Sequence, residues 1–262
     1  MPSNRSGTTV GWVLALLDLD GTLTDPYDGI TRSVTYALNG LGLPRLEERQ
    51  LRSFIGPPLQ DQFAALGLNE GDVVRAVELY RERFRDHGLY ENRVYEGVSE
   101  ALAALAAVPL RLAVATSKPT PFAQRIVEHF GLDVHLDVVA GATLDGSRRT
   151  KADVIRFALT ALAADPADAV MVGDRAQDVA GARALGLPSI GVTWGYAEPG
   201  ELEAAGADQV VGTPQELVNA LVDRHDRLHD HGSRWPNDNR TKDTGPRERG
   251  DRSVGDPLPV AW

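Results

Sequence analysis

Two aspartates near the start of the chain, Asp18 and Asp20, follow a short apolar run and are separated by Leu19. Alternate side chains of an extended strand project to the same side, so both carboxylates should share one site. Such close like charges favour a neutralising cation, and their hard oxygen atoms suit Mg²⁺. The pair therefore predicts a metal site, an acid–base pair or both. The alternative is a solvated turn, which Gly21 would allow.

A second pair of acids follows another apolar run. Asp174 comes directly after Gly173, and Asp178 lies four residues further on. This spacing places both carboxylates on one side of a helix as it begins. We expect Asp174 to bind the metal, whereas Asp178 either supports the site, contacts the metal or caps the helix.

Groups suited to holding a phosphoryl group lie between these acids. Thr116 and Ser117 end an apolar run just before Pro119, where hydroxyls and free N–H groups form an anion cradle, although Thr116 is equally suited to cap a helix. Lys151 begins a helical segment and can act as a point charge for a bound phosphate. Lys118, by contrast, is interpreted as a solvated charge.

The elements that must position these residues are short strands alternating with helices. Apolar runs of strand length occupy residues 13–17, 110–116, 137–140, 169–173, 189–194 and 208–211. Helical spacing marks residues 97–108, 119–131, 151–163, 176–186, 198–205 and 214–223. This alternation predicts an α/β fold, with a Rossmann-like parallel sheet flanked by helices. Ligands bind such sheets at the carboxyl ends of the strands.

One long segment interrupts the alternation. Residues 26–96 contain helical patterns at 30–41, 46–54, 58–66 and 71–87 and no convincing strand. We therefore expect an all-helical cap at 26–96 inserted into an α/β core formed by 13–25 and 97–222. Residues 1–12 are expected to be flexible. The stretch 223–262 is rich in Gly, Pro and charge, which predicts a disordered tail.

The composition of the chain argues against several classes of function. The formal net charge of -10 argues against a partner that is a nucleic-acid polymer, and the lack of cysteine removes thiolate nucleophiles and zinc-thiolate sites. No apolar run approaches the roughly 20 residues that cross a bilayer, and the amino terminus lacks a secretory pattern. We expect a cytoplasmic protein without a membrane partner. Its oligomeric state is not indicated.

These motifs resemble the haloacid dehalogenase superfamily, specifically its phosphoglycolate phosphatase and 5′-nucleotidase-like branch. The matching segments are DLDGTLTD at 18–25, VATSK at 114–118, Lys151 and GDRAQD at 173–178. The resemblance extends from about Val13 to Leu221 and includes FIGPPL at 54–59 and TWGYAEPGEL at 193–202.

The resemblance implies a role for each motif residue. Asp18 would attack phosphorus, and Asp20 would protonate the leaving oxygen and later activate water. Mg²⁺ would be held by the Asp18 carboxylate, the Asp20 backbone carbonyl and Asp174. Thr116 and Lys151 would hold the phosphoryl oxygens. Asp20 also argues against carbon–halogen cleavage, because dehalogenase members of the superfamily lack this second aspartate.

The insert would be a mobile cap that excludes water and selects the substrate. We expect hinges near Pro26–Gly29 and Tyr95–Gly97. The rigid loop of Gly56, Pro57 and Pro58 should face the active site, although a simple helix-breaking turn explains it too.

The sequence thus predicts a Mg²⁺-dependent phosphatase acting on a small phosphorylated metabolite. A nucleoside monophosphate is favoured over phosphoglycolate, because FIGPPL and GDRAQD look more like the nucleotidase branch. One alternative is transfer of the phosphoryl group to another acceptor, a sugar or a protein tyrosine. The other is a catalytically silent binding module.

Overall fold

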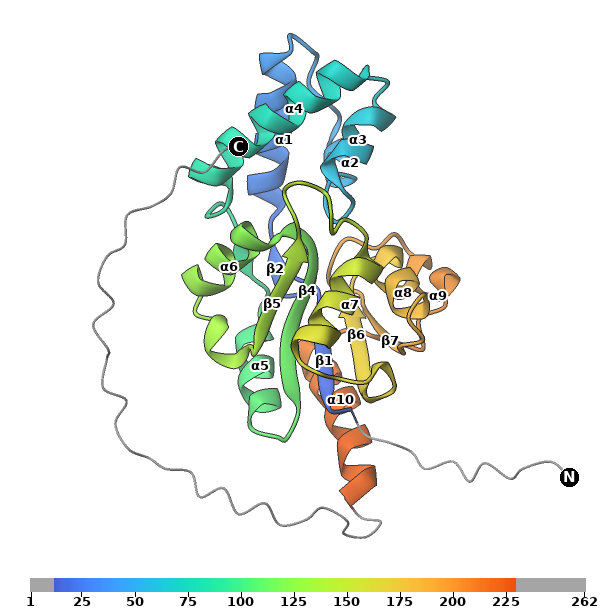
Figure 1. Ribbon diagram of the computed structural model, residues 1–262. Coiled ribbons are helices and arrows are strands. Elements are labelled where there is room, and N and C mark those ends of the chain that lie inside the picture. The colour runs from blue at the N-terminus through green and yellow to red at the C-terminus, as the bar shows by residue number, and fades with distance from the viewer. Residues whose placement is uncertain (1–11, 230–262) are drawn as a thin grey trace, which may run out of the picture. The chain divides into compact units, whose positions relative to one another are not determined.

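The computed structural model describes residues 12–229, with side chains to residue 222, and is built around one parallel sheet (Figure 1). Its strands lie in the order β5-β4-β1-β6-β7-β8. They are β1 (Leu14–Leu17), β4 (Arg111–Pro119), β5 (Val138–Ala142), β6 (Ala169–Gly173), β7 (Ser189–Val192) and β8 (Gln209–Val211). The chain builds outward from β1 first to one side and then to the other. The carboxyl end of β1 is therefore the switch point at which such sheets bind ligands.

Helices cover both faces of the sheet because the side chains of β1 alternate. Leu14 and Leu16 pack with α7 (Lys151–Ala161) and α8 (Ala176–Arg183). Ala15 and Leu17 belong to the opposite core, with α5 (Val98–Ala106), α6 (Thr120–His129) and α10 (Pro214–His229). Full burial of each leucine stabilises the fold by about 1.5–3 kcal/mol. Both faces thus hold β1 in place. A short helix, α9 (Glu201–Ala205), packs against α8.

The insert lies between two short strands, β2 (Thr24–Asp25) and β3 (Arg93–Val94), which pair antiparallel. Its helices are α1 (Tyr27–Gly40), α2 (Glu48–Arg52), α3 (Leu59–Ala65), α4 (Glu70–Arg83) and a π-helix, η1 (Phe84–Gly88). They gather beyond the carboxyl ends of β4 and β5 (Figure 1). The first turn of α1 touches η1, because a Cβ on Gly29 would come within 2.1 Å of the Gly88 carbonyl oxygen.

The expected fold class and all six strands of the sheet are confirmed. The expectation of no strand between residues 26 and 96 was wrong, because two residues such as β3 are too short to show alternation. Helix α10 also continues to His229, past the expected end near residue 223. The rest of the predicted tail and residues 1–11 lie outside the described residues. Trp12, the last residue of the segment expected to be flexible, is instead buried in the core. Within residues 12–229, no helix is long and apolar enough to cross a membrane.

Candidate active site

Asp18 is the first residue after β1, at the switch point of the sheet. Its backbone N–H donates to the Val172 carbonyl at 2.9 Å, and its Oδ1 accepts from the Leu19 N–H at 2.8 Å. The residue as a whole is 4% exposed. Its backbone is thus fixed by the neighbouring strand, and its carboxylate is held in a buried position.

Lys151 reaches Asp18 from the first turn of α7, which begins in a capping box of Thr150 and Asp153. Its Nζ lies 3.0 Å from Oδ1 of Asp18 and 2.6 Å from Oδ1 of Asp178. Burial by itself would lower the pKa of Lys151, but the carboxylates of Asp178 and Asp18 raise it above its ordinary value. The lysine is therefore a buried partner of these acids, and their carboxylates favour its charged form.

Three acids, Asp18, Asp174 and Asp178, each offer an oxygen within 4.8 Å of the others. Burial, then repulsion from Asp178 and Asp18, raises the pKa of Asp174 well above its ordinary value. Burial also raises the pKa of Asp178 to about 6, against the opposing attraction of Lys151. Lys151 contacts two of the three buried carboxylates, those of Asp18 and Asp178, so the cluster holds more acids than cations, and all the donors are hard oxygens. This donor set fits a divalent cation such as Mg²⁺.

The position of Asp174 depends on small neighbours and on two hydrogen bonds. Its Oδ2 accepts from the Tyr196 N–H at 2.8 Å, and its Oδ1 accepts from the Thr22 hydroxyl at 3.3 Å. A Cβ on Gly21 would lie 2.1 Å from Oδ2 of Asp174. Gly21 also has a φ of +87°, which L side chains rarely adopt. The glycine after Asp20 thus serves both the turn and the acid cluster.

Asp20 lies outside this cluster and faces Lys118 instead, whose Nζ is 2.8 Å from Oδ2 of Asp20. The expectation that Lys118 is solvated was wrong, since its side chain is 5% exposed. The reason is that β4 runs on to Pro119 and the ring of Phe84 covers the ammonium group at 4.5 Å. Burial raises the pKa of Asp20, and the positive charge of Lys118 opposes that rise.

Thr116 and Ser117 lie where expected, near the carboxyl end of β4. Thr116 is 1% exposed, and its hydroxyl accepts a hydrogen bond from the Lys118 N–H at 3.3 Å. The pairing of β4 with β5 shifts register between Thr116 and Pro119, and such irregularities re-aim side chains beside active sites.

One cavity runs between the carboxyl end of the sheet and the insert. Asp20, Ser117 and Lys118 line it from the sheet, and Gly56, Pro57 and Pro58 line it from the insert. The insert and α6 also supply aromatic walls, formed by Phe54, Tyr80, Phe84 and Phe122. Arg81 lines it as well, with an Nε that is buried and lacks a hydrogen-bond partner among the described residues. A ligand here meets flat apolar surfaces and positive charge.

Arg175, the residue after Asp174, ties the insert to the sheet. Its guanidinium donates to the Ile55 carbonyl at 2.8 Å and pairs with Glu201 of α9 at 2.9 Å. A second tie is the exposed ion pair of Arg149 with Asp61 in α3. The motif containing Asp174 is thereby linked to the loop that begins at Gly56.

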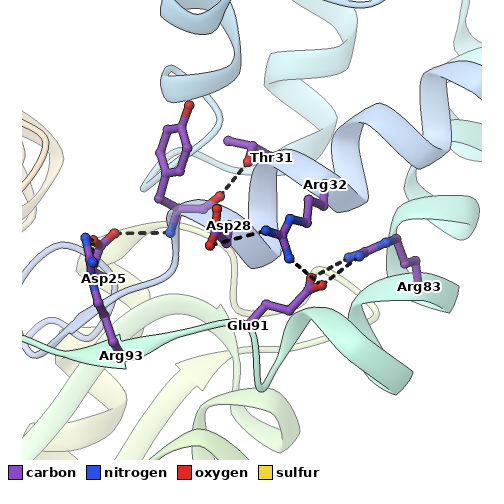
Figure 2. Close-up of polar contacts among 8 residues, drawn as sticks. Asp25, Asp28, Thr31, Arg32, Arg83, Glu91 and Arg93 are labelled. Atoms are coloured by element: carbon purple, nitrogen blue, oxygen red, sulfur yellow. Dashed lines mark hydrogen bonds and ion pairs between the residues drawn. The ribbon is translucent and has the colours of Figure 1, made fainter.

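Ion pairs stabilise the two points at which the chain passes between the sheet and the insert, after β2 and before β3 (Figure 2). Asp25, which ends β2, pairs with Arg93 of β3 at 2.5 Å and accepts a hydrogen bond from the Tyr196 hydroxyl. Glu91 binds Arg83 at 2.7 Å and Arg32 at 3.0 Å, so it connects the last turn of α4 to α1. Arg83, followed by Arg32, lowers the pKa of Glu91.

The predicted site residues thus fall into two adjoining groups. Asp18, Asp174, Asp178 and Lys151 surround one point, whereas Asp20, Ser117 and the loop at 56–58 line the cavity. The carboxylate of Asp178, rather than that of Asp20, joins the acid cluster. Sequence reasoning missed Lys118, Arg81 and Arg175. The one available signal was the position of Lys118 and Arg175 directly beside motif residues.

Comparison with known proteins agrees with this geometry. Residues 15–192 match the family described as haloacid dehalogenase-like hydrolase, and the chain belongs to this family. A 5′-nucleotidase of Pseudomonas aeruginosa is 46% identical over 190 residues, which are 72% of this chain and 86% of that protein. The tyrosine-protein kinase PtkA of Mycobacterium tuberculosis is 41% identical over 79% of this chain and 72% of its own length.

Solved structures lead to the same family. The crystal structure of "a predicted phosphatase from Clostridium acetobutylicum" superimposes with a TM-score of 0.78 at 42% identity, covering 81% of this chain and 99% of that one. The fold, the family and these relatives identify the chain as a phosphoric monoester hydrolase of the haloacid dehalogenase type.

Proposed function

We propose that the chain hydrolyses small phosphate monoesters in a Mg²⁺-dependent reaction that passes through a phosphoaspartyl intermediate on Asp18. The observation that carries this proposal is the surroundings of Asp18. Its Oδ1 lies 3.0 Å from Nζ of Lys151, and Asp174 and Asp178 each offer an oxygen within 4.8 Å of an Asp18 oxygen. A buried carboxylate beside a fixed cation and a cation-binding cluster suits attack on an anionic phosphate.

The cation is the cofactor of this proposal. The carboxylates of Asp18, Asp174 and Asp178, together with the backbone carbonyl of Asp20, would hold Mg²⁺. The bound ion would reduce the repulsion between the attacking carboxylate and the phosphate. Burial of the three carboxylates supports this assignment, because Lys151 contacts only two of them and a divalent ion would neutralise the remaining charge.

The remaining motif residues would hold the substrate and move protons. Thr116, Ser117 and Lys151 bind the phosphoryl oxygens, so that phosphorus lies in line with Asp18. Asp20 donates a proton to the leaving oxygen and then accepts one from water, a role worth about 10²–10⁴ in rate. Its place in the cavity wall, beyond the acid cluster, supports this role.

Residues 26–96 would act as a cap over a core of residues 13–25 and 97–222. The loop of Gly56, Pro57 and Pro58 would then select the leaving group. Its place in the cavity wall, opposite Asp20 and Lys118, supports this assignment. The ion pairs at Asp25 and Glu91 brace the two crossings near which the hinges are expected (Figure 2).

Among substrates, nucleoside monophosphates rank ahead of phosphoglycolate. The similarity to a 5′-nucleotidase supports this order. The aromatic walls of the cavity support it too, because they provide surfaces on which a flat base stacks.

Phosphoryl transfer to another acceptor is the second candidate. The specific observation in its favour is the 41% identity to a protein named as a tyrosine kinase. The same intermediate on Asp18 would serve a sugar or a tyrosine hydroxyl in place of water.

A panel of nucleoside monophosphates, phosphoglycolate and sugar phosphates, assayed with and without Mg²⁺, tests these proposals. Release of inorganic phosphate that requires Mg²⁺ supports hydrolysis, and the ranking of kcat/KM values identifies the substrate. Transfer to an added acceptor without net phosphate release supports the second candidate. Tight binding without turnover would overturn both in favour of a silent binding module.

A further inference from the structure

Lys118 occupies a costly position for a charged side chain. It is 5% exposed and is enclosed by the Asp20 carboxylate at 2.8 Å and the Phe84 ring at 4.5 Å. Lysine is seldom fully buried unless paired, and a buried ion pair is weak evidence of a stabilising role, because desolvation offsets the attraction. The position of Lys118 therefore invites a functional explanation.

The two oxygens of Asp20 have different surroundings. Oδ2 faces Nζ of Lys118 at 2.8 Å. Oδ1 is buried and has no hydrogen-bond partner among the described residues. Leaving a buried acceptor unsatisfied is unfavourable, so such atoms in a site are candidates for contact with a ligand. Asp20 also lines the cavity, where a leaving group would lie.

The backbone holds Lys118 firmly in this place. Its N–H donates to the Thr116 hydroxyl at 3.3 Å, within the segment where β4 and β5 shift register. On the other side, a Cβ on Gly141 of β5 would come within 2.3 Å of the Lys118 carbonyl oxygen. A lysine fixed on a strand end in this way can impose one orientation on its partner.

We propose that Lys118 is a positioning residue that holds Oδ2 of Asp20, so that Oδ1 is the atom that exchanges protons with the leaving oxygen and with water. This inference rests on the proposed hydrolase function. Phe84 belongs to η1, so the contact of its ring with the Lys118 ammonium group also links this orientation to the insert.

Asp20 gives up one proton in the first step and receives one in the second, so the two proton transfers balance. In the first step a bond forms between an Asp18 oxygen and phosphorus, the bond from phosphorus to the leaving oxygen breaks, and the proton of Asp20 moves to that oxygen. In the second step water gives a proton to Asp20 as its oxygen bonds to phosphorus. The bond between phosphorus and Asp18 then breaks, which releases inorganic phosphate and restores both aspartates.

The dependence of the rate on the leaving group tests the inference in the full-length, Mg²⁺-loaded protein. Ethyl phosphate needs a protonated leaving group, whereas p-nitrophenyl phosphate does not. We expect Lys118→Met to lower kcat/KM by about 10²-fold for ethyl phosphate and by less than about threefold for p-nitrophenyl phosphate. Lys118→Arg should restore part of the loss on ethyl phosphate.

A double-mutant cycle separates positioning from support of the fold. If Lys118 acts through Asp20, Lys118→Met should cause no further loss of ethyl phosphate hydrolysis in an Asp20→Asn background. Lys118→Met leaves Asp20 buried and unpaired, so the double variant should also unfold at a higher temperature than Lys118→Met alone. If Lys118→Met alone is too unstable to assay, the unfolding temperatures of the two variants still show whether Lys118 acts through Asp20.

Equal losses of kcat/KM on both substrates, or additive losses in the double-mutant cycle, would overturn the inference. Lys118 would then have only a structural role. Failure of the proposed function has a different signature. In that case the parent protein would hydrolyse neither ester, or Asp18→Asn would hydrolyse both at the parental rate.

Discussion

Nζ of Lys151 lies 3.0 Å from Oδ1 of Asp18, and the two side chains are only 4% and 5% exposed. Charge interactions are stronger at such depth than at a surface, because less water screens them. The same Nζ also contacts Asp178 at 2.6 Å and donates to the Ala115 carbonyl at 3.1 Å. The lysine therefore fixes the acid cluster relative to β4, and its removal should affect both chemistry and stability.

Lys151→Met should lower kcat by about 10²–10³, the usual loss when a preorganised charge-stabilising group is removed. In the absence of Mg²⁺ it should also lower the free energy of unfolding by about 3–5 kcal/mol, because the buried acids lose their partner. Arg156→Met is the matched control, since that side chain is 59% exposed on the same helix, and its stability should change by less than about 0.5 kcal/mol. Parental activity in Lys151→Met would refute the role of this lysine.

Gly21→Ala should abolish most activity and the thermal stabilisation by Mg²⁺, because its Cβ would lie 2.1 Å from Oδ2 of Asp174. Gly42→Ala is the control that separates the effect of crowding Asp174 from the effect of backbone strain. Gly42 also has a positive φ, of +69°, but nothing lies within 4 Å of its added Cβ. That variant should lose about 1–3 kcal/mol of stability and keep its activity. Activity assays and melting curves with and without Mg²⁺ would show the contrast, and equal behaviour of the two variants would argue against the acid cluster.

Arg175→Met should loosen the insert, because it removes the hydrogen bond to the Ile55 carbonyl. We expect faster hydrogen exchange of the amides at residues 54–63 and a higher KM, since closure over the substrate becomes less favourable. Arg183→Met, at the end of the helix that Arg175 caps and bonded to the Ala205 carbonyl, is the control and should leave both quantities unchanged. Unaltered exchange in Arg175→Met would show that this contact does not hold the insert.

Glu91→Gln should make stability less dependent on acid pH. Arg83 and Arg32 lower the pKa of Glu91, so its ionised form is favoured in the folded protein. Its contribution is therefore complete above the ordinary glutamate pKa and is lost as pH falls through the lowered value. The free energy of unfolding of the parent should exceed that of the variant by about 1 kcal/mol near neutral pH. This difference should disappear below about pH 4. A gap that persists or widens in acid, measured by denaturant unfolding, would contradict this assignment.

The sheet and its acids could be predicted because both are encoded locally. Each apolar run has strand length, and Asp18 and Asp174 come directly after β1 and β6. Parallel strands bring their carboxyl ends to one edge, so adjacency in space follows from topology. Lys151 could be placed for the same reason, since it begins the helix that packs under this edge.

The contacts of the cavity could not be predicted in this way. Lys118 meets Asp20 from the loop after β1 and Phe84 from η1, segments far apart in the sequence. A lysine next to a threonine and a serine has no pattern that distinguishes burial from exposure. The contact of Arg175 with Ile55 likewise depends on how the insert meets the sheet, which no local periodicity encodes.

Covalent labelling shows whether Asp18 is the residue that attacks phosphorus. The protein is mixed with radiolabelled phosphate monoester and Mg²⁺, quenched in acid within one turnover, digested and mapped. We expect a hydroxylamine-sensitive phosphate on the peptide that contains Asp18, lost on a chase with unlabelled substrate and absent from Asp18→Asn. Label on another residue, or hydrolysis by Asp18→Asn at the parental rate, would contradict it.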